Sequence, residues 1–399
     1  MKKILLVGLS LLMACPTFAK IKLPALVGSN MVLQREREVN LWGEASPSKK
    51  VTVTTSWDGR KYTTQSDSDG KWLLKVSTPA AGGPYTIRIS DGDPVTLENV
   101  MIGEVWVCSG QSNMQMSMTG NLGEPVDGGV EALIEAPKYK DIRLFYTPMV
   151  TSPQPVDTCG GEWKVSSSES VAPFSAAAYF FARDLNDALG VPVGLIQTAW
   201  GGTRIEAWMP EATAREVEAD IVQTNDRFEN PNKVGYLYNA MIRPLLNMTA
   251  RGFIWYQGES NVHTNNYPHY AHYMEKLVSQ WRGDWGDPDM PFYFVQLVPH
   301  IYEGGTDGIV LPLMIERTMY TEYELRAVKR DVEALKAALS EHLFTILEAN
   351  IAAEGANSLQ IVDKWIDYSM IEEGSMRAHA VLEVHRDIAT TRDALAREG

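Results

Sequence analysis

Ser112 stands where a serine nucleophile would be expected. It follows a short apolar run, 105–108, that has the composition of a strand, and a Ser-Gly pair and a glutamine separate the two. A serine on a sharp turn after a buried strand exposes its hydroxyl next to backbone N–H groups, and acyl transfer needs both. An ordinary strand-to-loop turn has the same pattern, because Gly and Ser are common there.

Two later segments place groups that could assist such a serine at the ends of predicted strands. The segment 192–198 is followed by a glycine pair, Gly201 and Gly202, whose backbone N–H groups are suited to hold an oxyanion. The segment 252–256 is followed by two amides and a carboxylate. These are Gln257, Asn261 and Glu259. Because parallel strands end at one edge of a sheet, the three segments predict a single site.

From residue 101 onward the pattern alternates between strands and helices, which is typical of a doubly wound parallel α/β sheet. The predicted helices are 175–189, 236–246 with a stop at Pro244, and 267–281, and the predicted strands are 105–108, 192–198, 252–256 and 292–297. We expect this domain to span 101–305. Its site should lie beyond the carboxyl ends of the strands.

The segment before it, 20–100, reads as short strands separated by turns, which predicts a small β-sandwich domain. The predicted strands are 39–42, 51–57, 61–65, 72–76 and 85–89. Such a module either binds carbohydrate or braces the next domain, and the sequence leaves both open.

Net charge and cysteine count exclude several classes of protein. The 399 residues carry a net charge of −14, so there is no basic surface of the kind that binds nucleic acid or anionic lipid. The chain has three cysteines, which rules out a disulfide framework and leaves one bridge, between Cys108 and Cys159, open.

Residues 1–19 have the charged, apolar and small-residue order of a secretory signal, so we expect an exported protein, periplasmic or extracellular. The string before Cys15 also resembles a lipoprotein cleavage box, in which Cys15 would carry a lipid anchor. No later stretch reaches the length of about 18 to 20 apolar residues that spans a bilayer.

Three ordered blocks then point to a known family. They are G-Q-S-N-M at 110–114, W-G-G-T-R-I-E-A-W at 200–208 and W-Y-Q-G-E-S-N at 255–261. The chain resembles the sialate O-acetylesterase family, within the SGNH (GDSL-like) hydrolases. The opening L-V-G-S-N-M-V-L-Q-R at 26–35 also fits, and the likeness covers about residues 21–302.

The resemblance implies an SGNH-like, flavodoxin-like three-layer sheet and a role for each residue of the blocks. Ser112 would be the nucleophile. The oxyanion would be held by the Ser112 N–H, by the N–H of Gly201 or Gly202, and by a side-chain amide, for which Gln257 is preferred over Asn261. Glu259 would orient the site or Arg204. The aromatic residues Trp200, Trp208 and Tyr256 would either wall a sugar pocket or belong to the core.

The family's general base is missing from its expected place. The resemblance implies a histidine in a D-x-x-H block near the C-terminus, and none of the seven histidines has Asp or Glu three residues before it. His263 and His300 are the preferred substitutes, because they lie near predicted strand ends. His379 and His385 are further candidates.

The last segment, 306–399, is poor in Pro and Trp and rich in Ala, Glu, Arg and Leu, which is helix composition. Nothing from about residue 313 onward resembles the family. An amphipathic helix is predicted there, packing on the domain or mediating self-association.

The leading hypothesis is a serine carbohydrate esterase that removes O-acetyl groups from sialic acid or related glycans, with no cofactor. His269 and His272 have helical spacing but no further ligands nearby, so a metal site is rejected. Two alternatives stay open. One is an acetyl xylan esterase, and the other is a catalytically impaired glycan-binding or scaffold protein.

Overall fold

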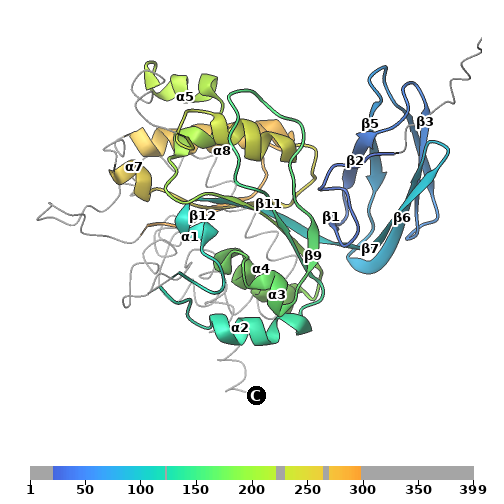
Figure 1. Ribbon diagram of the computed structural model, residues 1–399, viewed down its shortest axis with the longest axis horizontal. Helices are drawn as coiled ribbons and strands as arrows, with labels where there is room; N and C mark the ends of the chain where they lie inside the picture. The colour runs from blue at the N-terminus through green and yellow to red at the C-terminus, as the bar shows by residue number, and fades with distance from the viewer. Residues whose placement is uncertain (1–20, 122–123, 222–229, 264–268, 298–399) are drawn as a thin grey trace, which may run out of the picture.

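A single strand of 17 residues, β7 (Pro94–Gly110), belongs to both parts of the fold (Figure 1). The computed structural model describes residues 21–121, 124–221, 230–263 and 269–297. Residues 94–102 of β7 pair antiparallel with β6 (Gly82–Ser90), and residues 104–110 pair parallel with β10 (Val193–Ala199). The domain boundary expected after residue 100 therefore falls inside a strand. The predicted signal segment and helical tail lie outside the described residues.

The N-terminal part consists of two small sheets. In the larger one, the strand order is β4-β3-β6-β7, with β1 parallel to β7, and β2 and β5 form a separate antiparallel pair. The bounds are β1 Val32–Gln34, β2 Glu38–Glu44, β3 Lys50–Thr55, β4 Lys61–Gln65 and β5 Lys71–Ser77. In β3, Val51 and Val53 are buried and alternate with more exposed residues, as expected of a strand with one face on a core. All five strands predicted in this part are present.

The second part is a largely parallel sheet in the order β9-β8-β10-β7, continued on the other side of β7 by β11 and β12. The bounds are β8 Ile142–Tyr146, β9 Trp163–Val165, β11 Gly252–Tyr256 and β12 Phe292–Phe294. Only β9 runs antiparallel to its neighbour among these described strands. Because β10 and β11 flank β7 on opposite sides, the crevice beyond the end of β7 is a topological switch point, where open α/β sheets bind their ligands.

Helices cover both faces of this sheet. In Figure 1, α5 and α8 lie on one side and α2, α3 and α4 lie on the other, which confirms the predicted three-layer α/β fold. The α-helices are α1 Ser112–Gln115, α2 Gly129–Glu135, α3 Ser168–Val171, α4 Ala176–Leu189, α5 Glu211–Val217, α7 Glu259–His263 and α8 Tyr270–Trp285. Shorter turns are η1 Ala136–Lys138, η2 Ile205–Trp208, the π-helical η3 Tyr238–Ile242 and η4 Arg243–Leu245. No helix in the described ranges is long and apolar enough to cross a membrane.

Local signals explain where the longer helices begin and end. The Ser175 hydroxyl accepts a hydrogen bond from the Ala178 N–H at the start of α4, and Gly190 ends this helix in the left-handed conformation. The predicted stop at Pro244 is also present, because η3 ends at Ile242 and a 3₁₀ turn that contains the proline follows. The last predicted strand is shorter than expected: β12 covers 292–294 rather than 292–297.

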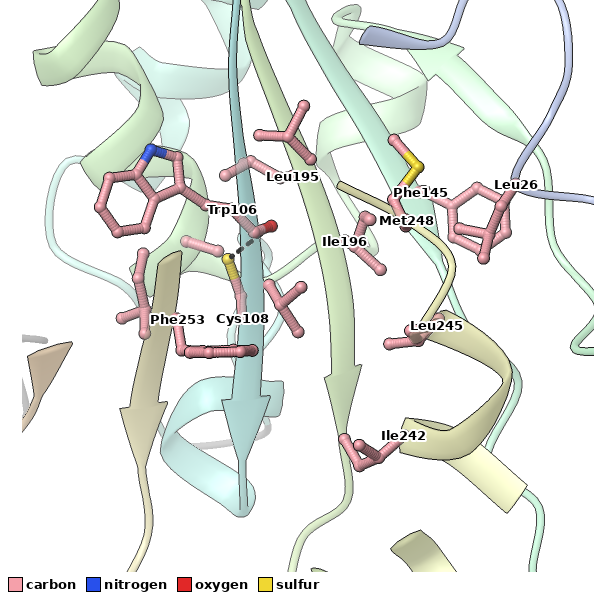
Figure 2. Close-up of a cluster of buried hydrophobic side chains, with 14 of the residues drawn as sticks. Leu26, Trp106, Cys108, Phe145, Leu195, Ile196, Ile242, Leu245, Met248 and Phe253 are labelled. Atoms are coloured by element: carbon pink, nitrogen blue, oxygen red, sulfur yellow. Dashed lines mark hydrogen bonds between the residues drawn. The ribbon is translucent and has the colours of Figure 1, made fainter. Parts of the chain in front are cut away.

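The core of the sheet is continuous across its three central strands (Figure 2). Trp106 and Cys108 on β7, Ile196 on β10 and Phe253 on β11 are all buried, as is Leu245 on η4. Fully buried parallel strands need apolar residues on both faces, which is why these runs do not alternate. Cys108 and Cys159 are both free thiols, so the bridge left open by the sequence is not formed.

Candidate active site

The end of β7 is held against the end of β11, and this contact sets the position of Ser112. A Cβ on Gly110 would lie 2.0 Å from the Tyr256 carbonyl oxygen, and the Gly110 φ is +142°. The Gln111 N–H then donates to the same carbonyl at 2.8 Å. Glycine is needed here because only a residue without Cβ allows this close approach of two backbones. Ser112 follows as the exposed first residue of α1.

The Gln111 side chain connects Ser112 to the loop after β11. Its buried Oε1 accepts from Gln257 Nε2 at 3.0 Å and from the N–H groups of Gly258 and Ser260, each at 3.3 Å. Gln111 could not be singled out from the sequence, because its role depends on which way the turn directs its amide. The residue before the nucleophile candidate is thus a fixed point of the site.

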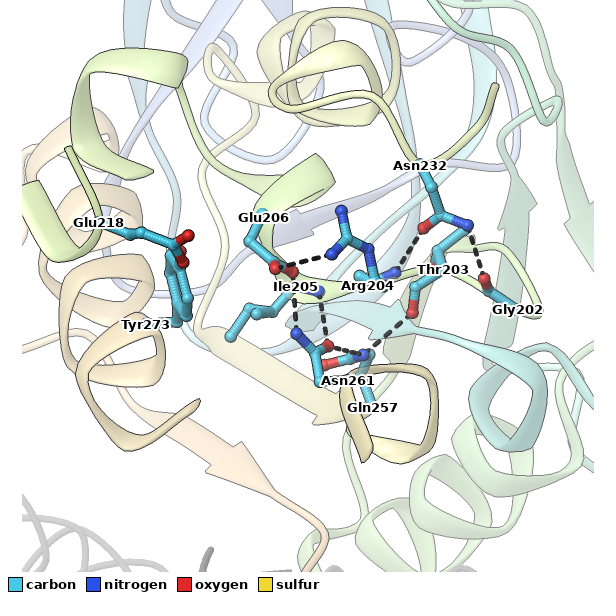
Figure 3. A network of polar contacts seen from close by, with 10 residues as sticks. All are labelled: Gly202, Thr203, Arg204, Ile205, Glu206, Glu218, Asn232, Gln257, Asn261 and Tyr273. Atoms are coloured by element: carbon cyan, nitrogen blue, oxygen red, sulfur yellow. Dashed lines mark hydrogen bonds and ion pairs between the residues drawn. The ribbon is translucent and has the colours of Figure 1, made fainter. Parts of the chain in front are cut away.

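Gln257 is fully buried, and its amide is engaged inside the protein (Figure 3). Nε2 donates to the Thr203 carbonyl at 2.9 Å and to Asn261 Oδ1 at 2.8 Å, besides Gln111. Its Oε1 accepts from the Tyr270 hydroxyl at 2.7 Å. The amide preferred for the oxyanion therefore ties together the ends of β7, β10 and β11.

Asn261 and Arg204 belong to the same buried network (Figure 3). Asn261 accepts from the Ile205 N–H at 3.1 Å and donates to Glu206 Oε2 at 2.8 Å. The other oxygen of Glu206 lies 3.2 Å from Arg204 Nη1, and both of these side chains are buried. Glu206, rather than Glu259, is thus the carboxylate that forms an ion pair with Arg204. Glu206 lies inside the second sequence block, but its role could not be inferred from the sequence.

The glycine loop after β10 lies beside Ser112, as the sequence predicted. A Cβ on Gly201 would be 3.4 Å from the Ser112 Cβ and 3.1 Å from the Gln115 Oε1. The Gly201 N–H donates to that same Oε1 at 2.6 Å. Gly202 has φ +73°, and open space surrounds the position of its missing Cβ. Asn232 Nδ2 donates to the Gly202 carbonyl at 2.9 Å and so secures the loop.

Glu259 contacts the residue next to Ser112. Asn113 Nδ2 donates to Glu259 Oε1 at 2.6 Å, whereas Glu259 Oε2 is buried with no hydrogen-bond partner in the described part of the chain. Burial raises the pKa of this carboxyl above its ordinary value, although the hydrogen bond from Asn113 opposes the rise. A carboxyl of raised pKa beside a nucleophile candidate is a frequent feature of active sites.

The three aromatic residues, which the sequence analysis assigned either to a sugar pocket or to the core, differ in burial. Trp208 is fully buried, with its Nε1 donating to Thr203 Oγ1 at 3.0 Å, and Tyr256 is also buried, so both belong to the core. Trp200 is half-buried and is the one of the three with a surface available to a ligand.

The described part of the structure does not include the side chains of the two preferred histidines. His263 is the last residue of α7, and its backbone alone is described. His300 lies outside the described residues. The identity of the base therefore stays a prediction. Within the described ranges, no group of three or more His, Cys, Asp or Glu side chains is arranged to hold a metal ion.

A comparison with known protein families shows which family this chain belongs to. The family described as carbohydrate esterase, sialic acid-specific acetylesterase matches residues 102–329, which is more than half of the chain. The chain belongs to this family. The resemblance expected from the three blocks is therefore confirmed, and the match extends past residue 313, where the sequence analysis expected it to end. It takes in all the residues of the candidate site described above.

Individual relatives carry the same relationship. The sialate O-acetylesterase of Homo sapiens is 30% identical over 311 residues, covering 70% of this chain and 58% of the relative. That of Mus musculus is 29% identical over 335 residues, covering 70% and 61%. A solved structure, a carbohydrate acetylesterase from Xanthomonas citri, has 34% identity and a TM-score of 0.63, covering 70% of this chain and 61% of that one. The chain thus spans about three fifths of the length of these curated acetylesterases.

Proposed function

We propose that this protein is a serine carbohydrate esterase that removes O-acetyl groups from sialic acids or related glycans. The observation that carries the proposal is the position of Ser112, exposed at the end of the central strand with the Gly201 loop packed beside it. Membership of the acetylesterase family supports the choice of ester and sugar.

The reaction would use Ser112 as nucleophile. Its Oγ attacks the acetyl carbonyl carbon and loses its proton to a general base, and the carbonyl oxygen becomes an oxyanion. The tetrahedral intermediate then expels the sugar oxygen, which takes up the proton. Water releases acetate from the acetyl-serine in a second attack of the same kind. His263 and His300 are the proposed bases.

Backbone N–H groups are the proposed oxyanion donors, at Ser112 and at Gly201 or Gly202. The loss of one such donor typically reduces kcat by a factor of about 10² to 10³. Gln257 and Asn261 are fully buried and their amides donate to acceptors in the core, so we assign these two residues, with Arg204, to positioning of the loops. Glu259 would act on the site through Asn113.

The test is hydrolysis of 4-nitrophenyl acetate by the wild-type chain and by Ser112→Ala. Ser68→Ala, an exposed serine in the N-terminal part, is the matched control. We expect Ser112→Ala to lose activity to the background rate and Ser68→Ala to keep it. Substitution of His263 and His300, one at a time, should identify the base by a loss of similar size.

Two substrates separate the alternatives. Faster release of acetate from O-acetyl sialic acid than from acetylated xylan supports the proposal, and the reverse order would identify an acetyl xylan esterase. Glycan binding by a wild-type protein that is no faster than Ser112→Ala would favour a catalytically impaired binding protein.

We also propose that residues 1–19 direct export, to the periplasm or the outside of the cell. Cell fractionation of the full chain tests this proposal, and release of the protein from membranes only by detergent would favour the lipid anchor at Cys15. Size-exclusion chromatography of the full chain and of a variant that lacks the tail segment 306–399 tests the proposed self-association.

A further inference from the structure

The side chain of Gln115 accepts a hydrogen bond from a backbone N–H group that the reaction would need. Its side-chain Oε1 accepts the Gly201 N–H at 2.6 Å, so this N–H already has an acceptor before any substrate binds. Gln115 is the last residue of α1, and Ser112 is the first. Since residues three positions apart lie on the same face of a helical turn, the side chain of Gln115 is carried next to the nucleophile candidate.

The surroundings of Gln115 leave its amide able to move. The other end of the amide, Nε2, lies 3.1 Å from Met149 Sδ, and a thioether is a weak acceptor. Gln115 is half-buried, and Met149 is exposed. The strong contact of this side chain is therefore the one with Gly201.

The chemistry of the two competing acceptors differs between substrate and transition state. An ester carbonyl is neutral, like the Gln115 carbonyl, and has no advantage over it as an acceptor of the Gly201 N–H. An oxyanion is charged, and hydrogen bonds to charged acceptors are about twice as strong as neutral ones. The oxyanion can thus displace Gln115, whereas the ground-state ester gains nothing by doing so.

We propose that Gln115 is a placeholder for the acyl oxygen, which keeps the Gly201 N–H bonded in the resting site and releases it to the oxyanion. The inference rests on the proposed esterase function, and it selects Gly201 as an oxyanion donor. It makes Gln115 a positioning residue that weakens binding of the ester without slowing its conversion.

Two substitutions of Gln115 should act in opposite directions. Gln115→Met has similar size and no strong acceptor, so we expect KM to fall by about 5-fold, the factor that one neutral hydrogen bond represents, with kcat unchanged. Gln115→Glu places a charged acceptor on the Gly201 N–H and a negative charge beside the oxyanion. We expect its kcat/KM to fall and to recover as pH is lowered and the carboxylate is protonated. Gln154→Met, an exposed glutamine, is the control and should change neither constant.

A purely structural role for Gln115 would give a different result. In that case the loop around Gly201 would lose its support, and kcat would fall in both variants while KM stayed constant. Such a result overturns the proposal, as does an unchanged KM in a folded Gln115→Met protein.

A second readout does not need turnover. In ¹⁵N-glycine-labelled protein, the Gly201 amide resonance is the one missing from Gly201→Ala, and loss of a short hydrogen bond should move its proton upfield in Gln115→Met. Sodium acetate, the reaction product, should then bind at Gly201 about 5-fold more tightly in Gln115→Met than in wild type. If the wild type shows no esterase activity, the proposed function fails, but the amide shift and the acetate titration still decide whether Gln115 occupies this donor. An unmoved resonance or equal acetate affinity overturns the inference.

Discussion

The missing Cβ of Gly110 would lie 2.0 Å from the carbonyl oxygen of Tyr256, closer than a non-bonded carbon and oxygen can approach. This contact between the ends of β7 and β11 directs the chain into Ser112. The glycine at 110 is therefore a geometric requirement of the turn, and the first prediction tests it.

Gly110→Ala should destabilise the protein by about 3 kcal/mol or more, because backbone strain at φ +142° adds to a direct overlap with Tyr256. Gly190→Ala is the matched control, since Gly190 also has positive φ but nothing within 4 Å of its missing Cβ. Gly190→Ala should destabilise the protein by only about 1 to 2 kcal/mol. Urea unfolding followed by circular dichroism measures both, and equal losses would contradict the steric argument.

Glu206→Gln should destabilise the protein by about 3 to 5 kcal/mol, because it removes the charge that faces the buried Arg204 guanidinium. The same substitution at Glu211, whose ion pair with Arg215 is exposed, should change stability by less than about 1 kcal/mol. Chemical denaturation of the two variants gives the comparison. A small effect at Glu206 would show that the pair contributes little to the fold.

Tyr270→Phe should destabilise the protein by about 1 to 3 kcal/mol, because the buried hydroxyl donates a hydrogen bond to the Gln257 amide oxygen. No other donor among the described residues replaces it. Esterase activity should fall together with stability if Gln257 positions the loops around Ser112. Tyr146→Phe, on a partly exposed ring, is the control and should alter neither property. Thermal unfolding and 4-nitrophenyl acetate hydrolysis are measured on the same samples.

Glu259→Gln should stabilise the protein increasingly as pH rises above about 4.5, the ordinary value for this carboxyl. Burial raises the pKa of Glu259 in the folded state, so folding favours the protonated form, and the stability that this provides at low pH is lost as pH rises through the folded pKa. The glutamine does not ionise and keeps an acceptor for Asn113.

The measurement is the difference in melting temperature between wild type and Glu259→Gln at acidic and neutral pH. Glu98→Gln, an exposed carboxylate in the N-terminal part, serves as the control. A difference for Glu259→Gln that shrinks toward neutral pH would mean that the carboxylate is stabilised in its charged form.

Elements with a strong local composition were predictable from the sequence. The predicted strands 61–65 and 252–256 coincide with β4 and β11, because runs of β-branched and aromatic residues favour a pleated surface. The first half of β7 was not predicted as part of the central strand. Its residues alternate between exposed and buried, and pairing with β6 determines that this segment continues into the second sheet.

The order of the blocks along the chain determined which groups reach the site. A serine, a glycine pair and a polar cluster each follow a strand, and parallel strands deliver their ends to one edge, so the meeting of Ser112 with Gly201 could be inferred from the sequence by itself.

Only the tertiary structure decided which polar groups bond to one another. Glu206 rather than Glu259 pairs with Arg204, Gln257 is directed inward, and Gln115 takes the Gly201 N–H. The two glutamates are chemically alike, as are the two glutamines, so residue type does not distinguish between them. A hydrogen bond acts over only about 3 Å, so the choice among them depends on the register of β7, β10 and β11 and on the direction of the short helices that follow.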